Sequence, residues 1–327
     1  MPLLSEAEVE AYADEVEERG YCIIPSAIDA ELLGRLLDAQ RRFVPNGETV
    51  LNLLSKSEAF CDLAAAPNVL RVVKRILGED CLLSSGTLTA PKGGTGPQEY
   101  HTDDQMYGRE LFERPLKHQL SVNCATALAP FTELNGATKL VPFSHRWHIF
   151  PTRHGIFPTA DADVIAAQDD EIRARGSAAE QAVMSPGSTV IWAGATWHAR
   201  GTNHTARESG GGRGCVLMHY CRGELRQQEN IMLSIEREQA MRMAPDVQRL
   251  IGYSSTVGAL GLAESQRAPL DMPAMLLGEG GAALLAEVME NYGERVGAHF
   301  ANLTAQLDEH KRREAAGSSS GSGSSKL

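Results

Sequence analysis

The residues best suited to chemistry lie in QEYHTDDQ, the segment that covers residues 98–105. It places His101 and Asp103 two positions apart, and on a β-strand this spacing points both side chains to the same face. An imidazole nitrogen and a carboxylate oxygen can then bind one metal ion. His-x-Asp alone does not define a metal site, because such pairs occur often by chance on protein surfaces.

A third ligand is offered by the segment SPGSTVIWAGATWHARGTNHT, in which a Pro-Gly turn and an apolar strand lead to His198. Alone, such a histidine is more often a hydrogen-bonded core residue. Together with His101 and Asp103, it completes the two-histidine, one-carboxylate triad that holds Fe(II) in non-haem oxygenases. Three coordination positions then stay open for a cosubstrate and O₂.

Arg213 opens the next apolar segment, RGCVLMHY. An oxygenase that consumes 2-oxoglutarate needs a deep cation to hold the far carboxylate, and a guanidinium binds a carboxylate through two parallel hydrogen bonds. The alternative is a surface arginine next to the glycine-rich loop that precedes it.

The scaffold expected around these residues is mostly β. Short β-rich segments alternate with Gly, Pro and Asn turns, which is typical of a sandwich or barrel; the segments are CLLSSGTLTA, LSVNCATAL, ATKLVPF, STVIWAG and CVLMHY. We therefore predict a β-core between about residues 80 and 225, with helices packed on it from both ends.

Helix signals flank this core. A capping box predicts a helix within residues 5–20, and a short strand follows at residues 21–25. Asp29 can cap a second helix, and a third is expected over residues 67–77. The region 282–313, rich in Ala, Leu, Glu and Arg, predicts a last helix.

Size and composition bound the remaining possibilities. The chain has 327 residues, 43% of them hydrophobic, which suits a single domain over residues 1–316 followed by a Gly/Ser tail at 317–327. The net charge of −11 and the lack of a basic stripe speak against nucleic acid as a partner. We find no apolar run long enough for a membrane helix and no signal peptide. The six scattered cysteines predict buried thiols in a reducing compartment.

These motifs together resemble the phytanoyl-CoA dioxygenase family of Fe(II)- and 2-oxoglutarate-dependent oxygenases. The resemblance covers about residues 20–225. It rests on Gln98–Asp104, on ELNGATKLVPFSH at Glu133–His145, on the strand that leads to His198, on GTNHT at Gly201–Thr205, and on Arg213–Tyr220.

The resemblance implies a double-stranded β-helix, or jelly-roll, core. It implies His101, Asp103 and His198 as iron ligands and Arg213 as the 2-oxoglutarate anchor. Further cosubstrate contacts are implied for three polar residues: Gln98, Thr138 and Asn52. For Asn52, a turn residue is an equally good interpretation.

Two departures from the family pattern matter. Phe143 stands where the family usually has glycine, so we expect a reshaped loop near the mouth of the site. The stretch between His198 and Arg213 is longer than usual, which makes Arg207 the alternative anchor. Asp103 argues against a halogenase, because related halogenases lack the carboxylate ligand.

The implied reaction couples decarboxylation of 2-oxoglutarate to oxidation of a substrate C–H bond by Fe(II) and O₂, with ascorbate helpful in vitro. We expect a small apolar metabolite, as in secondary metabolism, held in a pocket that five apolar segments could line: Met106, Tyr107, Trp192, Trp197 and Trp147–Phe150. The alternatives are an acyl-CoA hydroxylase, a metal-free jelly-roll binding module, and a hydrolase or isomerase with a cupin-like metal site.

The chain ends in Ser325-Lys326-Leu327 on a flexible polar tail. A C-terminal SKL predicts recognition by a peroxisomal import receptor, and without it the expected location is cytoplasmic. Both a chance match and a remnant Gly/Ser tail are alternative explanations. A homodimer is also left open.

Overall fold

The computed structural model describes residues 2–45, 49–108, 111–151, 160–206, 212–257 and 259–262. The chain divides into two compact units, Met1–Ile231 and Met232–Leu327. Most of the second unit lies outside the described residues, so the expected single domain over residues 1–316 stays a prediction. The helix expected at 282–313 and the tail with its peroxisomal signal lie outside the described residues and stay predictions. None of the helices in the described part is long and apolar enough to cross a membrane.

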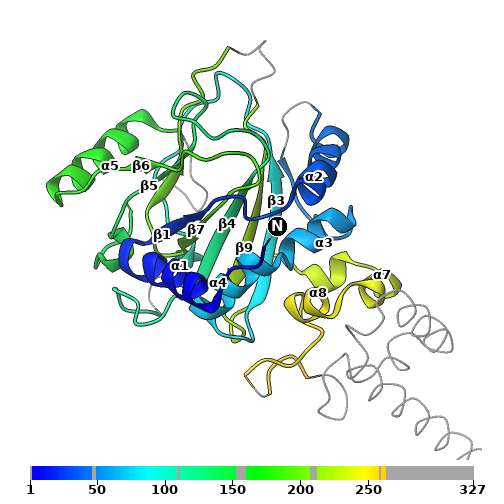
Figure 1. Cartoon of the computed structure of the whole chain (residues 1–327). Coiled ribbons are helices and arrows are strands. Elements are labelled where there is room, and N and C mark those ends of the chain that lie inside the picture. The colour runs from blue at the N-terminus through cyan, green and yellow to red at the C-terminus, as the bar shows by residue number, and fades with distance from the viewer. Residues whose placement is uncertain are drawn as a thin grey trace, which may run out of the picture. The chain divides into compact units, whose positions relative to one another are not determined.

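Two antiparallel sheets form the core of the first unit (Figure 1). The larger sheet has the strand order β1 (Tyr21–Ile24), β7 (Thr189–Ala193), β4 (Ser121–Ala127), β9 (Cys215–Cys221), β3 (Leu82–Thr89) and β2 (Thr49–Val50). The smaller sheet has the order β6 (Glu180–Gln181), β5 (Thr138–Leu140) and β8 (His198–Arg200). Strands distant in sequence are therefore neighbours in both sheets, and the mostly β core is confirmed.

Helices lie on both sides of these strands in the sequence. Before the core come α1 (Glu6–Arg19), α2 (Ala30–Phe43), α3 (Glu58–Ala64) and α4 (Pro67–Leu77). Helix α5 (Ala162–Ala174) separates β5 from β6, and α6 (Ile231–Ser234), α7 (Arg237–Arg242) and α8 (Pro245–Leu250) follow β9.

The predicted caps explain where the first helices begin and end. Ser5 and Glu8 form the reciprocal capping box of α1, and Gly20 ends that helix at φ +100°, a conformation that glycine adopts without strain. The Asp29 side chain accepts the Leu32 N–H at 2.8 Å and caps α2. The helices expected within residues 5–20, after Asp29 and over 67–77 are thus confirmed.

The central strands of the larger sheet are buried. Every residue of β4 and β7 is buried. Helices α1 and α4 pack on each other and against β7 and β4, respectively. The opposite face looks into a cavity between the two sheets. All six cysteines are buried and free, as predicted.

Candidate metal and cosubstrate site

His101 and His198 are brought together by backbone pairing. The N–H of each donates to the carbonyl of the other at 3.0 Å, so the segment at His101 extends the small sheet beside β8. Nδ1 of His101 lies 3.1 Å from the Glu99 carbonyl, and Nδ1 of His198 lies 2.9 Å from the Thr196 carbonyl. A carbonyl only accepts, so each Nδ1 carries the proton and each Nε2 carries the lone pair that a metal ion requires.

The His-x-Asp spacing predicted that Asp103 lies on the same strand as His101, and this prediction is wrong. The Asp103 backbone is helical, at φ −88° and ψ −21°, and it begins the 3₁₀ turn Asp104–Tyr107. The N–H groups of Asp103 and Asp104 both donate to the Gly194 carbonyl, at 2.8 and 3.3 Å. A Cβ on Gly194 would lie 2.1 Å from the Ser121 hydroxyl and 3.2 Å from the Ser121 carbonyl oxygen, so a side chain at this contact would force Ser121 to move.

The three predicted ligands converge. Asp103 Oδ1 lies 4.0 Å from Nε2 of His101, and its Oδ2 lies 3.2 Å from Nε2 of His198. One ligand atom of each residue lies within 4.8 Å of the other two. Two imidazole nitrogens and one carboxylate form the donor set that non-haem Fe(II) prefers, so the residues present fit the implied metal.

The electrostatics of Asp103 match a cation site. Burial acts to raise the pKa of Asp103, but the contacts with the facing imidazoles of His198 and His101 outweigh burial, so the pKa lies well below its usual range. Asn123 on β4 donates from Nδ2 to Oδ2 of Asp103 at 2.7 Å. This amide orients the carboxylate, and the sequence motifs did not reveal it.

The triad opens into a cavity of about 650 Å³ that is lined by both sheets. Arg213 lines the same cavity, is 3% exposed, and stacks over Phe131 at 4.3 Å. Its Nε and Nη1 are buried without a hydrogen-bond partner. Burial lowers the pKa of Arg213. A buried guanidinium with unpaired donors is costly unless an anion pairs with it, so this site fits the far carboxylate of 2-oxoglutarate.

The cavity holds a second arginine that the sequence motifs did not reveal. Arg200 follows His198 by two residues on β8 and lines the cavity with it. Burial lowers the pKa of Arg200, and the positive charge of Arg213 lowers it further. Gln98 and Thr138, both predicted as cosubstrate contacts, also line the cavity. The Gln98 Oε1 accepts a hydrogen bond from the backbone N–H of Arg200 at 3.2 Å. Thr138 is the cross-strand partner of Arg200.

A polar row crosses the large sheet at the level of the triad. Trp192 on β7, Asn123 on β4, His219 on β9 and Ser85 on β3 are successive cross-strand partners, and all four line the cavity. His219 is 4% exposed, and its Nε2 has no hydrogen-bond partner. Burial lowers the pKa of His219 more than the charge of Asp103 raises it, so the ring is neutral.

Not every predicted site residue lies here. Asn52 is absent from the described cavity lining; its φ is +54°, and its backbone N–H lies by the Glu229 carboxylate, which suits the turn interpretation. Phe143 adopts φ +63°, the left-handed conformation that glycine would favour, and is also absent from that lining. The expected change of the loop near the mouth stays a prediction. Arg207 lies outside the described residues.

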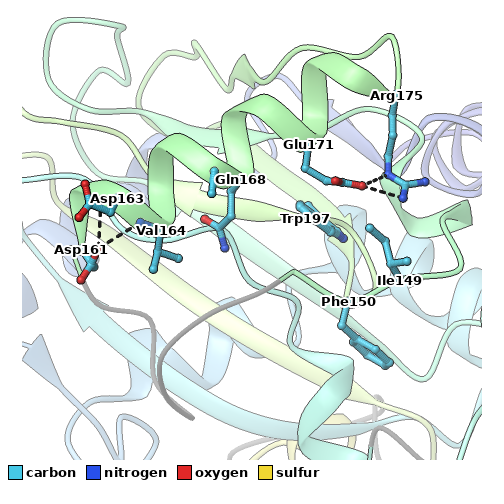
Figure 2. A pocket seen from close by; sticks show the side chains of 10 residues that line it. Ile149, Phe150, Asp161, Asp163, Val164, Gln168, Glu171, Arg175 and Trp197 are labelled. Atoms are coloured by element: carbon cyan, nitrogen blue, oxygen red, sulfur yellow. Dashed lines mark hydrogen bonds and ion pairs between the residues drawn. The ribbon is translucent and has the colours of Figure 1, made fainter.

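The predicted aromatic pocket is divided between two cavities. Met106 and Trp192 line the metal cavity. Trp197, Ile149 and Phe150 instead line a second cavity of about 740 Å³ beneath α5, which we call the outer cavity (Figure 2). Trp197 directly precedes β8, which begins at His198. Neighbouring residues of an extended chain point to opposite sides, which explains why Trp197 and His198 line different cavities.

Comparison with known proteins agrees with this geometry. The sequence model of the family named phytanoyl-CoA dioxygenase (PhyH) matches residues 2–209. The chain therefore belongs to the phytanoyl-CoA dioxygenase family, as its motifs predicted.

Curated relatives are fungal dioxygenases. The chain is 27% identical to dioxygenase andF of Emericella variicolor over 206 residues, which are 62% of this chain and 63% of that protein. It is 26% identical to dioxygenase trt7 of Aspergillus terreus over 198 residues, which are 59% of this chain and 62% of that protein. The matches thus span just under two thirds of these relatives' length.

A solved structure supports the fold. The epimerase SnoN in complex with Fe3+, alpha ketoglutarate and nogalamycin RO aligns with a TM-score of 0.52 at 17% identity, over 67% of this chain and 85% of SnoN. At this identity the likeness concerns the fold alone. The predicted jelly-roll core with flanking helices is confirmed.

Proposed function

We propose that this protein is an Fe(II)- and 2-oxoglutarate-dependent oxygenase that oxidises a C–H bond of a small apolar metabolite. One observation carries the proposal: the His101, Asp103 and His198 ligand atoms lie within 4.8 Å of one another, in the cavity that also holds the unpaired guanidinium nitrogens of Arg213. A metal triad alone fits several activities. A triad next to a buried, unpaired arginine fits a dicarboxylate cosubstrate that binds the metal at one end.

The roles of the chain's own residues follow from their positions. His101, Asp103 and His198 would hold the iron, while Arg213 would pair with the far carboxylate of 2-oxoglutarate. Arg200 would add a second positive charge on the same side of the cavity. The iron, when bound, supplies the activation of O₂ that is coupled to decarboxylation of the keto acid, and the protein supplies orientation and exclusion of water.

The cavity entrance supports an apolar substrate. Leu51 and Met106 line the cavity and are 55% and 43% exposed, so they offer apolar surface at its rim. Leu217 adds apolar surface from β9. The relatives are named dioxygenases of fungi, and SnoN, an epimerase from nogalamycin biosynthesis, binds nogalamycin RO in its crystal structure. These relationships favour a secondary metabolite over an acyl-CoA ester.

One assay separates the proposed function from the alternatives. Wild-type protein with Fe(II), ascorbate, air and 2-oxoglutarate should release succinate, and omission of Fe(II) should abolish this release. A metal-free binding module, or a hydrolase or isomerase that does not use 2-oxoglutarate, would release none. An apolar metabolite that increases the succinate rate would then identify the substrate class, and acyl-CoA esters form the comparison set.

A further inference from the structure

A buried ion pair adjoins the metal-binding turn. Asp104 directly follows Asp103, and its carboxylate accepts hydrogen bonds from the Arg114 guanidinium. Asp104 is 4% exposed and Arg114 is 9% exposed. Neither residue lines the metal cavity among the described residues. The pair thus lies outside the described lining of the cavity in which the metal and the cosubstrate would bind.

Arg114 joins the two segments that carry the ligands. Its Nη2 donates to the Thr102 hydroxyl at 3.3 Å as well as to Asp104, so it holds both chain neighbours of Asp103. Its Nη1 donates to the Ala195 carbonyl at 3.2 Å, in the turn that leads to His198. One guanidinium therefore fixes the Asp103 turn against the start of the His198 strand.

Residues of the outer cavity support the same arrangement. The Arg114 guanidinium lies 4.1 Å from the centre of the Phe150 ring, and Figure 2 shows Phe150 at the lining of that cavity. Gln168 of α5 also lines it, and binds the neighbour of His101: its Nε2 donates to the Tyr100 carbonyl at 2.8 Å, and its Oε1 accepts the Tyr100 N–H at 2.7 Å. Gln168 and Arg114 thus hold chain neighbours of His101 and Asp103, respectively.

Stability alone does not explain such a pair. Removing two charges from water is costly, and apolar replacements of buried ion pairs are often as stable as the pairs themselves. Hydrogen bonds that orient metal ligands, in contrast, commonly contribute about 10–100-fold to metal affinity. The contacts of Arg114 with Thr102, Asp104 and Ala195 therefore favour a role in geometry.

We propose that Arg114, through its pair with Asp104, is a positioning residue that sets the Asp103 carboxylate at the distance from His198 that metal binding requires. This inference rests on the proposed function, because it assumes that the triad binds a metal. It predicts that loss of the pair lowers metal affinity more than it lowers stability.

The test measures Mn(II) binding by EPR of the free ion, together with the melting temperature. The variant Asp104→Leu/Arg114→Met replaces the pair by apolar side chains, which avoids an unpaired buried charge. We expect its Mn(II) affinity to fall about 10–100-fold while the melting temperature stays near that of the wild type. Arg114→Lys keeps the charge but cannot donate from two nitrogens in the planar arrangement of a guanidinium, and we expect an intermediate loss of Mn(II) affinity.

The control Arg35→Met/Asp62→Leu removes an ion pair between α2 and α3, and should leave Mn(II) affinity unchanged.

The outcomes are distinguishable. Mn(II) affinity within twofold of the wild type in either folded Arg114 variant would overturn the inference while leaving the proposed function intact. If the double variant does not fold, Arg114→Lys decides the question in the same way. A wild-type protein that binds no Mn(II) would overturn both the inference and the metal site beneath it.

Discussion

Nε2 of His198 lies 3.2 Å from Oδ2 of Asp103, although the two residues come from distant segments of the chain. Backbone pairing of His101 with His198 and the shared Gly194 carbonyl produce this contact. Opposed imidazole and carboxylate groups at this distance form a ready site for a cation. The ligand variants are therefore the first test of the site.

His101→Ala, Asp103→Ala and His198→Ala should each fold and lose Fe(II)-dependent succinate release. Each change removes one of three ligands at the cavity surface and leaves the packed sheets intact. Circular dichroism and metal content after dialysis check folding and binding separately. Retention of wild-type metal content and turnover by any one variant would remove that residue from the triad.

Arg213→Ala should raise the KM for 2-oxoglutarate with little effect on metal affinity. A buried charge-assisted pair contributes about 2–5 kcal/mol, which corresponds to an increase of roughly 30-fold or more. Arg222→Ala is a suitable control, because Arg222 pairs with Glu224 in the segment after β9. An increase caused by Arg207→Ala and not by Arg213→Ala would move the anchor to Arg207.

Asn123→Ala should lower metal affinity about tenfold by freeing the Asp103 carboxylate to rotate. Thr126→Val is the matched control on the same strand, since it breaks a buried hydroxyl pair with Thr189 at 2.8 Å that lies outside the described cavity lining. Mn(II) titration of both variants makes the comparison. Equal affinities for Asn123→Ala and the wild type would show that the amide does not position the ligand.

Stability should fall as the pH drops below about 6.5, in part because of His145. Burial lowers the pKa of His145 from its usual 6.5. Its Nε2 bonds to the Glu17 carbonyl at 2.9 Å, and its Nδ1 is buried without a partner. The folded state therefore binds a proton less readily than the unfolded chain. This contribution is complete above pH 6.5 and is lost as the pH falls towards the folded pKa.

Melting temperatures between about pH 5 and pH 8 test this prediction. His145→Gln keeps an N–H donor for Glu17 and removes the titrating group. We expect the variant to lose less stability on acidification across this range than the wild type does. An identical pH profile for both proteins would assign the acid sensitivity to other groups.

Local sequence signals were sufficient for much of the fold. The caps at Ser5 and Asp29 and the proline at position 67 act within one turn of helix, so their effect is readable without tertiary contacts. Helix α5 was not predicted. The triad itself was identified correctly as a cluster, but for a partly wrong reason: Asp103 reaches the site from a turn bonded to Gly194, and not from the strand.

The rest of the site depends on strand register. Asn123 and His219 are polar residues inside apolar strands, which was an available signal, but their meeting with Ser85 follows only from the pairing of β4 with β9 and of β9 with β3. Arg200 could have been found from its two-residue spacing to His198, which places both on one face of β8. The Arg114–Asp104 pair had no comparable local signal, because a buried partner cannot be read from either residue alone.

The proposed function requires that one cavity holds a metal ion and a dicarboxylate together. A crystal structure of the protein with Mn(II) and 2-oxoglutarate, prepared without oxygen, is the decisive measurement. We expect Mn(II) bound by Nε2 of His101, a carboxylate oxygen of Asp103 and Nε2 of His198, with the far carboxylate of 2-oxoglutarate on Arg213. A metal bound elsewhere, or a 2-oxoglutarate carboxylate that leaves the Arg213 guanidinium unpaired, would contradict this assignment.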